Sequence, residues 1–247
     1  MNFDRSSGYI QTDDAALYYE TYPSLKQDAP CLILLHGNGE DLHIFDDFID
    51  CLIPSHSLVA MDTRHHGRSS QGIRELSYVL FAEDLFALVN ELKIGSFLVL
   101  GFSDGAITAL EFALRHKELL TAMILVGGNI SPSGLSFFTR AGLLLLSLIH
   151  RTRDTLTRVK RDATRLIELM LGQAEITCEQ LGDITVPALV IHGEFDMIKQ
   201  SHSALIASSL PHARRVMIPG ASHFVMKDDP REFKRVLLEF LQEVAIG

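Results

Sequence analysis

The chain has 247 residues, 47% of them hydrophobic, which suits one large α/β domain with a substantial core and excludes a disordered protein. A formal charge of −9 argues against a nucleic-acid partner, because binding to phosphates requires clustered Lys and Arg. The three cysteines, Cys31, Cys51 and Cys178, are odd in number and far apart, which is typical of reduced thiols in a cytoplasmic protein.

Targeting and membrane-spanning segments are not predicted. The amino-terminal residues include no apolar stretch of the kind found in signal peptides. The longest apolar run, 142–149, is shorter than the ~20 residues that cross a bilayer. We therefore expect a cytoplasmic location and no stable membrane association.

Short apolar runs alternate with amphipathic stretches in the first half of the chain. A hairpin is predicted from 9–11 and 16–22, turning at Asp13-Asp14. Continuous apolar runs predict strands buried on both faces of a parallel sheet, at 31–35, 58–61, 97–100 and 122–126. Apolar residues at helical spacing predict helices at 41–52, at 75–92 and directly after Ser103.

The pattern changes between residues 129 and 179, where two or three helices and no strand are predicted. Alternation then resumes with two predicted strands and two predicted helices, at 188–192, 202–209, 215–218 and 231–244. This alternation predicts a mostly parallel sheet with helices on both faces. Because residues 129–179 have no place in that sheet, we expect a small helical cap on a core made of 1–128 and 180–247.

The motif Gly-Phe-Ser-Asp-Gly lies at 101–105, between a predicted strand and a predicted helix. A sharp turn there would lift the hydroxyl of Ser103 above the edge of the sheet, and only glycine tolerates the crowding on either side. The backbone N–H of Asp104 would stay free at the helix N-terminus, where it can stabilise a developing negative charge. The motif indicates a nucleophilic serine, and the alternative is an ordinary helix-capping serine.

Two further strand ends carry an acid and a base. Ligands of an open parallel sheet bind beyond the carboxyl ends of its strands, so catalytic side chains are expected there. Asp196 follows the strand 188–192, and His223 follows the last strand. A serine needs a base to take its proton, and the imidazole needs a carboxylate to fix its tautomer. Glu194 on the same loop is the alternative acid, and we favour Asp196 for its reach.

Five segments carry motifs in one order along the chain: His36-Gly37-Asn38-Gly39, Asp62-x-Arg64-x-x-Gly67-x-Ser69, Gly101-x-Ser103-x-Gly105, His192-Gly193-x-x-Asp196 and Gly220-x-Ser222-His223-Phe224. They resemble the oxyanion loop, the loop after the next strand, the nucleophile elbow, the acid loop and the histidine loop of the α/β-hydrolase family. The order of serine, aspartate and histidine also matches that family. Within it, Gly-Phe-Ser-Asp-Gly followed by Ile-Thr-Ala-Leu is most similar to the biphenyl-hydrolase-like, or valacyclovir-hydrolase-like, esterases.

The resemblance covers nearly the whole chain and implies an α/β-hydrolase fold with a mostly parallel, eight-stranded sheet. It implies a catalytic triad of Ser103, Asp196 and His223, and an oxyanion hole formed by the backbone N–H groups of Asn38 and Asp104. No cofactor and no metal are implied. The residues expected to contact the substrate are Asp104, Gly37 and Phe224.

Two positions depart from the family pattern. His65 stands where a glycine is usual, and Ala106 stands where a second glycine is common after the elbow. Neither is a triad position, but His65 is expected to alter the floor of the pocket. No Cys or carboxylate lies at ligand spacing from the pair His65-His66, so we favour loop bracing over a metal site. We interpret His36 and His192 as structural for similar reasons.

Two features have both a structural and a functional interpretation. The carboxylate of Asp104 either is a first-turn acid favoured by the helix dipole or lies at the pocket rim, where it attracts cationic substrates such as amino-acid esters. The apolar stripe 142–149 is either the packed face of a cap helix or a lid that touches a membrane. We favour the packed face, because cap helices must pack somewhere.

We predict hydrolysis of a small-molecule carboxylic ester through an acyl-enzyme intermediate. Thioesterase, amidase, lactonase and carbon–carbon bond hydrolase activities stay open, because the same triad serves them. A cofactor-free perhydrolase or haloperoxidase and a non-catalytic binding module are alternatives from other classes. Epoxide hydrolases and haloalkane dehalogenases of this fold place Asp at the nucleophile position, whereas this chain has Ser103.

Overall fold

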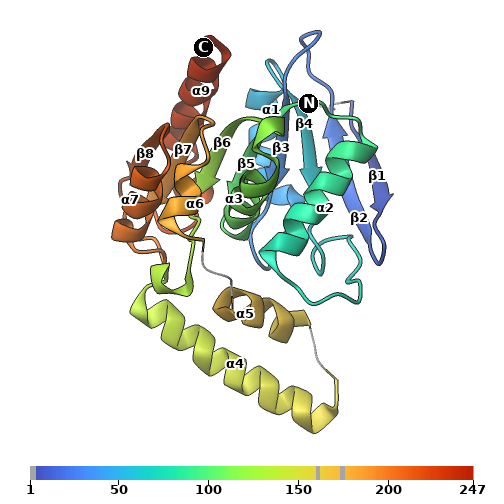
Figure 1. Cartoon of the computed structure of the whole chain (residues 1–247), viewed down its shortest axis with the longest axis vertical. Helices are drawn as coiled ribbons and strands as arrows, with labels where there is room; N and C mark the ends of the chain where they lie inside the picture. The colour runs from blue at the N-terminus through green and yellow to red at the C-terminus, as the bar shows by residue number, and fades with distance from the viewer. Residues whose placement is uncertain (1–3, 160–161, 173–175, 247) are drawn as a thin grey trace.

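The computed structural model describes residues 4–159, 162–172 and 176–246, and the strands of these residues form one eight-stranded sheet (Figure 1). The strand order is β1-β2-β4-β3-β5-β6-β7-β8. β2 pairs antiparallel with β1 and β4, and every later pair of neighbours is parallel, which confirms the predicted mostly parallel sheet. The strands are β1 (Ser6–Gln11), β2 (Ala16–Tyr22), β3 (Cys31–Leu35), β4 (Ser57–Met61), β5 (Phe97–Phe102), β6 (Leu120–Val126), β7 (Ala188–Gly193) and β8 (Ala213–Ile218).

Helices cover both faces of the sheet. α2 (Tyr78–Glu91) and α3 (Asp104–His116) pack on one face, and α1 (Asp46–Leu52) and α9 (Pro230–Ile246) pack on the other. The other helices are α4 (Phe137–Thr157), α5 (Asp162–Gly172), α6 (Cys178–Gly182), α7 (Gln200–Ser209), α8 (Val225–Asp228) and the 3-10 helices η1 (Leu42–Phe45), η2 (Lys117–Leu119) and η3 (Pro132–Gly134).

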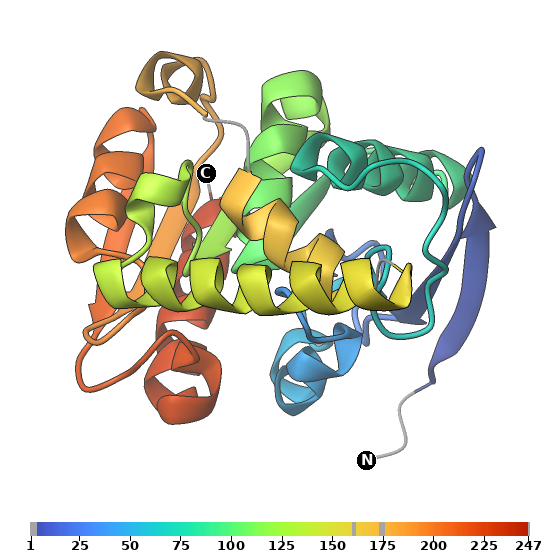
Figure 2. The ribbon, with the colours of Figure 1, turned by 90° about the horizontal axis from the view of Figure 1, so that it is seen from below.

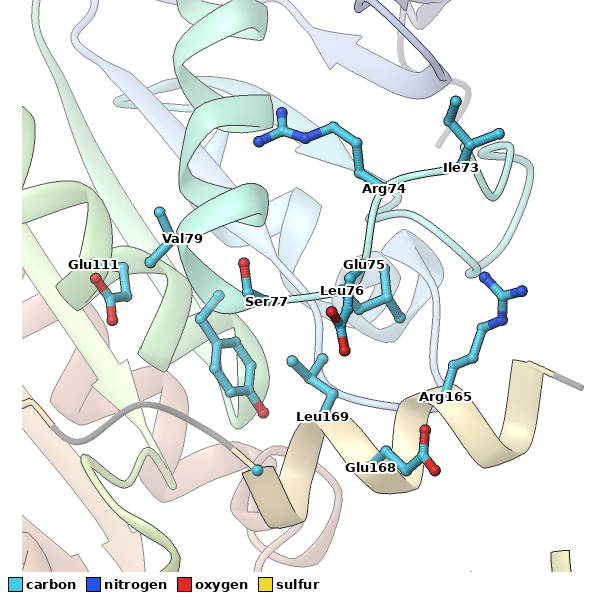
Figure 3. Close-up of a pocket in the computed structure, with 12 residues that line it drawn as sticks. Ile73, Arg74, Glu75, Leu76, Ser77, Val79, Glu111, Arg165, Glu168 and Leu169 are labelled. Atoms are coloured by element: carbon cyan, nitrogen blue, oxygen red, sulfur yellow. The ribbon is translucent and has the colours of Figure 1, made fainter. Parts of the chain in front are cut away.

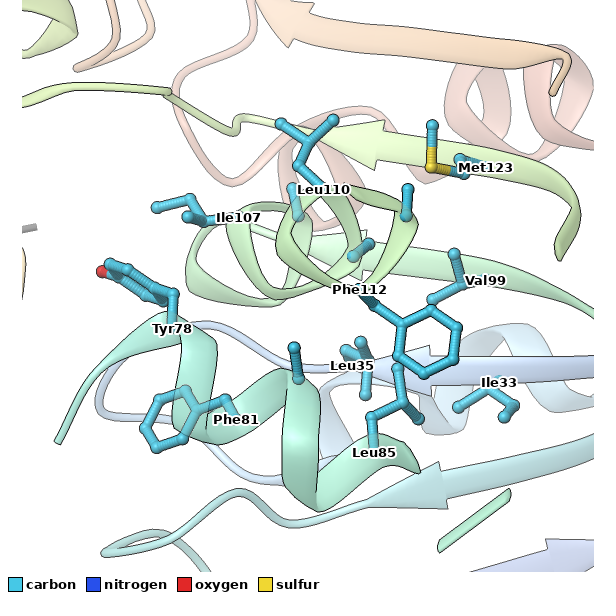
Figure 4. Packing of buried hydrophobic residues seen from close by; sticks show 14 of the residues in the cluster. Ile33, Leu35, Tyr78, Phe81, Leu85, Val99, Ile107, Leu110, Phe112 and Met123 are labelled. Carbon is cyan, nitrogen blue, oxygen red and sulfur yellow. The ribbon is translucent and has the colours of Figure 1, made fainter. Parts of the chain in front are cut away.

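The central strands supply side chains to two separate apolar cores, because successive strand residues point to opposite faces. Ile33 and Leu35 pack with α2 and α3, whereas Leu32 and Leu34 pack with α1 and α9. In Figure 4, Phe112 of α3 lies over the strands on the first of these faces. Burying each such side chain stabilises the fold by about 1.5–3 kcal/mol.

Strand register brings the ends of the parallel strands to one edge. Leu35 at the end of β3 is paired with Gly101, and Phe102 at the end of β5 is paired with Val126. A slip of one residue would turn every buried strand side chain to the opposite face, so the apolar pattern specifies this register. The loops that carry the predicted site residues therefore leave the sheet side by side.

Capping residues explain where the predicted helices begin. Ser77 accepts a hydrogen bond from a first-turn N–H at 3.1 Å, so α2 begins after it and not at residue 75. The predicted helix at 41–52 divides into η1 and α1, and Asp41 caps the first of these by accepting from the N–H of His43. The segment's apolar side chains are buried as its spacing predicts.

The predicted cap region contains α4 and α5, which lie beyond the edge of the sheet where the site loops meet (Figures 1 and 2). α6, which begins at the end of this region, packs against α7 beside the core. Residues 160–161 and 173–175 of the predicted cap lie outside the described residues.

The prediction that the stripe 142–149 is a packed face is wrong. Within α4 only Ser147 and Asp154 are buried. The large side chains of the stripe are mostly exposed, among them Leu144, Leu148 and Ile149 at 53%, 63% and 54%. The physical reason is that α4 presents its small and polar side to α5, and the side chain of Asp154 accepts a hydrogen bond from Thr164 there at 2.6 Å.

Candidate active site

Ser103 lies on a sharp turn between β5 and α3. Its backbone has φ 53° and ψ −114°, a conformation that costs a residue with a side chain ~1–3 kcal/mol. A Cβ on Gly101 would lie 2.3 Å from the carbonyl oxygen of Gly105, and a Cβ on Gly105 would lie 2.1 Å from that of Leu35, so only glycine fits on either side. Ser103 occupies the N-cap position of α3, yet its hydroxyl makes no capping hydrogen bond, which argues against the capping alternative.

The structure joins Ser103, His223 and Asp196 in one chain of hydrogen bonds. Nε2 of His223 lies 3.0 Å from Oγ of Ser103, and Nδ1 of His223 lies 2.7 Å from Oδ1 of Asp196. A carboxylate only accepts hydrogen bonds, so this contact favours a proton on Nδ1 and leaves the lone pair of Nε2 facing the hydroxyl. The side chain of Asp196 is fully buried, and its Oδ1 also accepts from the N–H of Ile198 at 2.9 Å.

Glu194, the alternative acid, lies away from the imidazole. Its Oε2 accepts a hydrogen bond from the N–H of Gly220 at 2.8 Å, which ties its loop to the end of β8. The two acids of this loop therefore have different partners, and Asp196 is the one that contacts His223.

Two buried histidines hold the predicted oxyanion loop. Nδ1 of His36 donates to the carbonyl of Gly37 at 2.7 Å, and its Nε2 accepts from the N–H of Thr63 at 3.0 Å. Nε2 of His66 accepts from the N–H of Gly39 at 3.0 Å. Burial lowers the pKa of both imidazoles to about 4, so both are neutral near pH 7 and able to accept these bonds. Both side chains brace the loop.

The loop passes close to Ser103, where the backbone N–H groups of Asn38 and Asp104 are the predicted oxyanion donors. A Cβ added to Gly37 would lie 3.0 Å from Cβ of Ser103, so the backbone approaches the hydroxyl without a side chain between them. Among the described residues, neither N–H has an intramolecular acceptor. Free N–H groups beside a serine hydroxyl are what a developing oxyanion requires.

The carboxylate of Asp104 is turned inward. Its Oδ1 accepts from the hydroxyl of Tyr78 at 2.9 Å, and its Oδ2 accepts from the side-chain amide of Asn38 at 3.0 Å. Burial raises the pKa of Asp104, and the two hydrogen bonds oppose that rise. With 6% of the residue exposed, the carboxylate lies beneath the site and not at an open rim. Tyr78 was not predicted here, because its place in an amphipathic helix carries no motif.

Phe224, a predicted substrate contact, lies beside His223. Its ring centroid is 5.7 Å from that of His223, and the ring of Phe102 lies 5.0 Å from the imidazole. Phe224 is 37% exposed, so part of this residue is accessible to solvent.

His65 connects the loop after β4 to α5. It has φ 64°, the left-handed conformation that the glycine of the family pattern adopts without strain. Its buried Nδ1 lies 2.7 Å from Oδ1 of Asp162 in α5, and Oδ2 of Asp162 accepts from Nε2 of Gln71 at 2.8 Å. No group of three candidate metal ligands occurs among the described residues. The contact with Asp162 was not predicted, because it joins residues far apart in the sequence.

Arg64 of the same loop holds the amino-terminal hairpin and α2 together. It is 1% exposed, and its guanidinium makes two hydrogen bonds to Asp84, at 2.6 and 2.9 Å, and one to Asp14, at 2.6 Å. A guanidinium forms such paired bonds with a carboxylate because its donors are planar and fixed. Arg64 is thus a structural residue of the motif.

α5 forms a wall of two cavities that border the site without including Ser103. One, of about 450 Å³, lies between α5 and the start of α2 and includes Tyr78 and Arg165 (Figure 3). The other, of about 610 Å³, lies between α5 and the oxyanion loop and includes Glu40 and His65. The carbonyl of Leu166 in α5 accepts from the side-chain amide of Asn38 at 3.3 Å, so α5 also contacts the oxyanion loop directly.

Comparison with known proteins agrees with the class that this fold and this site define. A family model described as the alpha/beta hydrolase fold matches residues 30–148. The chain is an α/β-hydrolase-fold hydrolase. The narrower similarity to the biphenyl-hydrolase-like esterases stays a prediction.

Individual relatives differ in the reactions that their names describe. The chain is 25% identical to the pimeloyl-[acyl-carrier protein] methyl ester esterase of Yersinia enterocolitica, over 86% of this chain and 93% of that protein. It is 24% identical to epoxide hydrolase 3 of Xenopus tropicalis, over 96% of this chain and 78% of that protein. The enol-lactonase of Burkholderia xenovorans LB400 has a TM-score of 0.78 at 22% identity, covering 95% of this chain and 100% of that structure.

Proposed function

We propose that the chain is a serine hydrolase that cleaves small carboxylic esters through an acyl-enzyme intermediate. The observation that carries the proposal is the hydrogen-bonded chain from Ser103 through His223 to Asp196, with distances of 3.0 and 2.7 Å. The strained turn at Ser103 adds to it, because such strain in a non-glycine residue is found where a side chain must be presented to a ligand.

In the proposed reaction, Oγ of Ser103 attacks the ester carbonyl while Nε2 of His223 takes its proton. The negative oxygen of the tetrahedral intermediate accepts hydrogen bonds from the N–H groups of Asn38 and Asp104. His223 then gives the proton to the departing alkoxide. Water repeats the same steps on the acyl-enzyme and releases the acid, and Asp196 stabilises the imidazolium each time. Losing one oxyanion donor typically raises the barrier by about 3 kcal/mol.

Ester cleavage is favoured within the class by the nucleophile and by one relative. The Yersinia relative is a methyl ester esterase, and it aligns with most of the chain. The epoxide hydrolase relative does not change the proposal, because an aspartate is expected at the nucleophile position of that group and this chain has Ser103. The enol-lactonase supports the fold, and lactones are cyclic esters that the same mechanism can open.

The test is turnover of p-nitrophenyl acetate, butyrate and octanoate by the wild-type protein and by Ser103→Ala. We expect hydrolysis that the substitution abolishes, together with loss of labelling by a fluorophosphonate probe. Ser208→Ala is the matched control, because Ser208 is exposed on α7 and bonds only within its own helix. Labelling of neither protein, with no turnover, would favour a binding module. Labelling without ester turnover would favour carbon–carbon bond hydrolysis, to be assayed with a vinylogous dioxo acid.

A further inference from the structure

α4 exposes a continuous apolar stripe at the outer end of the molecule, which begins at Phe137 and includes the residues 142–149. Its exposed members include Phe137, Phe138, Leu145 and Leu148, which are 60% to 85% exposed. They recur at the spacing that places residues on one side of a helix. α4 is the outermost element seen from below, with α5 behind it (Figure 2). The stripe therefore faces away from the core.

Arginines border the stripe on both sides. Arg140 lies four residues before Leu144, and Arg151 lies three residues after Leu148. This helical spacing places both arginines along one edge of the stripe. Arg153 follows the other edge, four residues after Ile149. All three arginines are exposed.

The charge of α4 is opposite to that of the whole protein. The helix contains three arginines and one acidic residue, Asp154, in a chain with a formal charge of −9. Asp154 is buried against α5, where Thr164 donates to it, so it does not offset the arginines at the outer surface. Arg151 forms an ion pair with Glu168 of α5 at 3.1 Å, so the argument from charge rests mainly on Arg140 and Arg153.

We propose that α4 docks reversibly on the surface of an anionic phospholipid bilayer. A helix with an exposed apolar face flanked by arginines lies in the interface plane, with its apolar side chains at the acyl boundary and its arginines at the headgroups. None of the described helices has the length and hydropathy to span a bilayer, so the contact is a surface one. The rest of the protein has a net negative charge, so an anionic surface favours docking through α4 over docking through the rest of the chain.

A second copy of the chain fits the stripe less well. A two-fold contact through α4 would place the bordering arginines of one copy beside those of the other. Anionic headgroups would neutralise these arginines instead. The proposal goes beyond ester hydrolysis and does not depend on it. It also agrees with the expectation of no stable membrane association, since one amphipathic helix binds reversibly.

The experiment is co-sedimentation of the full chain with phosphatidylcholine vesicles, with and without phosphatidylglycerol. We expect binding to the anionic vesicles that weakens with salt. Leu144→Glu/Leu148→Glu should weaken it by roughly tenfold or more, because charge replaces the side chains that enter the interface. Leu25→Glu/Ile246→Glu is the matched control, with the same charge change at two other exposed apolar positions, and it should retain binding.

Arg140→Gln/Arg153→Gln tests the electrostatic part and should remove the preference for anionic vesicles. Because all these positions are exposed, thermal melts and turnover of a soluble ester should match the wild type, which separates docking from folding and from catalysis. No binding to anionic vesicles at low salt would overturn the proposal. Equal loss in the control pair would also overturn it, as would a dimer in solution that Leu144→Glu/Leu148→Glu dissociates.

Discussion

The imidazole of His65 is hydrogen-bonded to the carboxylate of Asp162, and its Nδ1 lies 2.7 Å from Oδ1. The two residues are 97 positions apart in the sequence. The first partner lies in the loop after β4, and the second lies in the first turn of α5. His65 has a left-handed backbone that a glycine would adopt with less strain. The hydrogen bond from its side chain to Asp162 offsets the cost of that strain. The pair fixes α5, which contacts the oxyanion loop through Leu166 and Asn38.

His65→Gly should therefore raise KM while leaving the free energy of unfolding nearly unchanged. The substitution relieves about 1 kcal/mol of backbone strain but releases α5 from the core. We expect KM for a p-nitrophenyl ester to rise several-fold, with kcat less affected. Lys93→Gly is the control, because Lys93 also has a positive φ, of 54°, and follows the C-terminal end of α2, whereas α5 faces the start of that helix. A rise in KM in both variants would assign the effect to general loosening of the backbone.

Asp196→Asn should lower kcat by about 10³ to 10⁴ with little change in stability, because an amide can donate to Nδ1 and so favour the wrong tautomer of His223. Glu194→Gln is its isosteric counterpart on the same loop, and it should retain most of the activity. Steady-state kinetics of both variants, checked by thermal melts, make the comparison. A larger loss from Glu194→Gln would reverse the assignment of the acid.

Asp104→Asn tests whether the buried carboxylate selects cationic substrates. If its charge acts on the substrate, kcat/KM should fall more for an amino-acid ester than for a neutral ester of the same alcohol. The side-chain amide can still bond to Tyr78 and Asn38 after rotation, so the fold should persist. Tyr78→Phe is the companion variant, because it removes one hydrogen bond and keeps the charge. An equal loss on both esters would assign Asp104 a purely structural role.

The protein should lose stability as the pH falls from about 6.5 to about 4. The pKa of His36 and of His66 is lowered to about 4 in the folded state, so the unfolded chain binds more protons in this window and acid favours unfolding. Each histidine contributes at most about 3 kcal/mol of this loss. Urea unfolding of the wild type and of His66→Gln, at a series of pH values, measures it. His212→Gln, at an exposed position, should leave the pH dependence unchanged.

Arg64→Met should reduce the free energy of unfolding by about 3–5 kcal/mol, since it leaves the buried carboxylate of Asp84 and the partly buried carboxylate of Asp14 without their cation. Arg235→Met is the contrasting variant. Arg235 also bonds two acids, Glu232 and Glu239, but it is 53% exposed, so its loss should cost less than about 1 kcal/mol. If chemical denaturation showed equal losses of unfolding free energy for Arg64→Met and Arg235→Met, the burial of Arg64 would add nothing to the stabilisation by its ion pairs.

The sequence by itself determined the alternation of strands and helices and the order of the motifs. These properties are local. Period-two and helical spacing indicate which face of a strand or helix is buried, and the glycines on either side of Ser103 indicate a turn that has no room for a side chain. The parallel sheet and its two apolar cores follow from that information. The resemblance to the α/β-hydrolases was accessible for the same reason, since each of its motifs occupies one loop.

Only the tertiary structure decided which distant side chains meet. Asp196 and Glu194 are two residues apart, and the path of the chain from β7 and β8 is what gives Asp196 the contact with His223. Tyr78 reaches Asp104 only because α2 and α3 pack together. The stripe 142–149 shows the limit of periodicity, because an apolar face is compatible with a core, a partner or a membrane, and its surroundings in the fold leave it exposed.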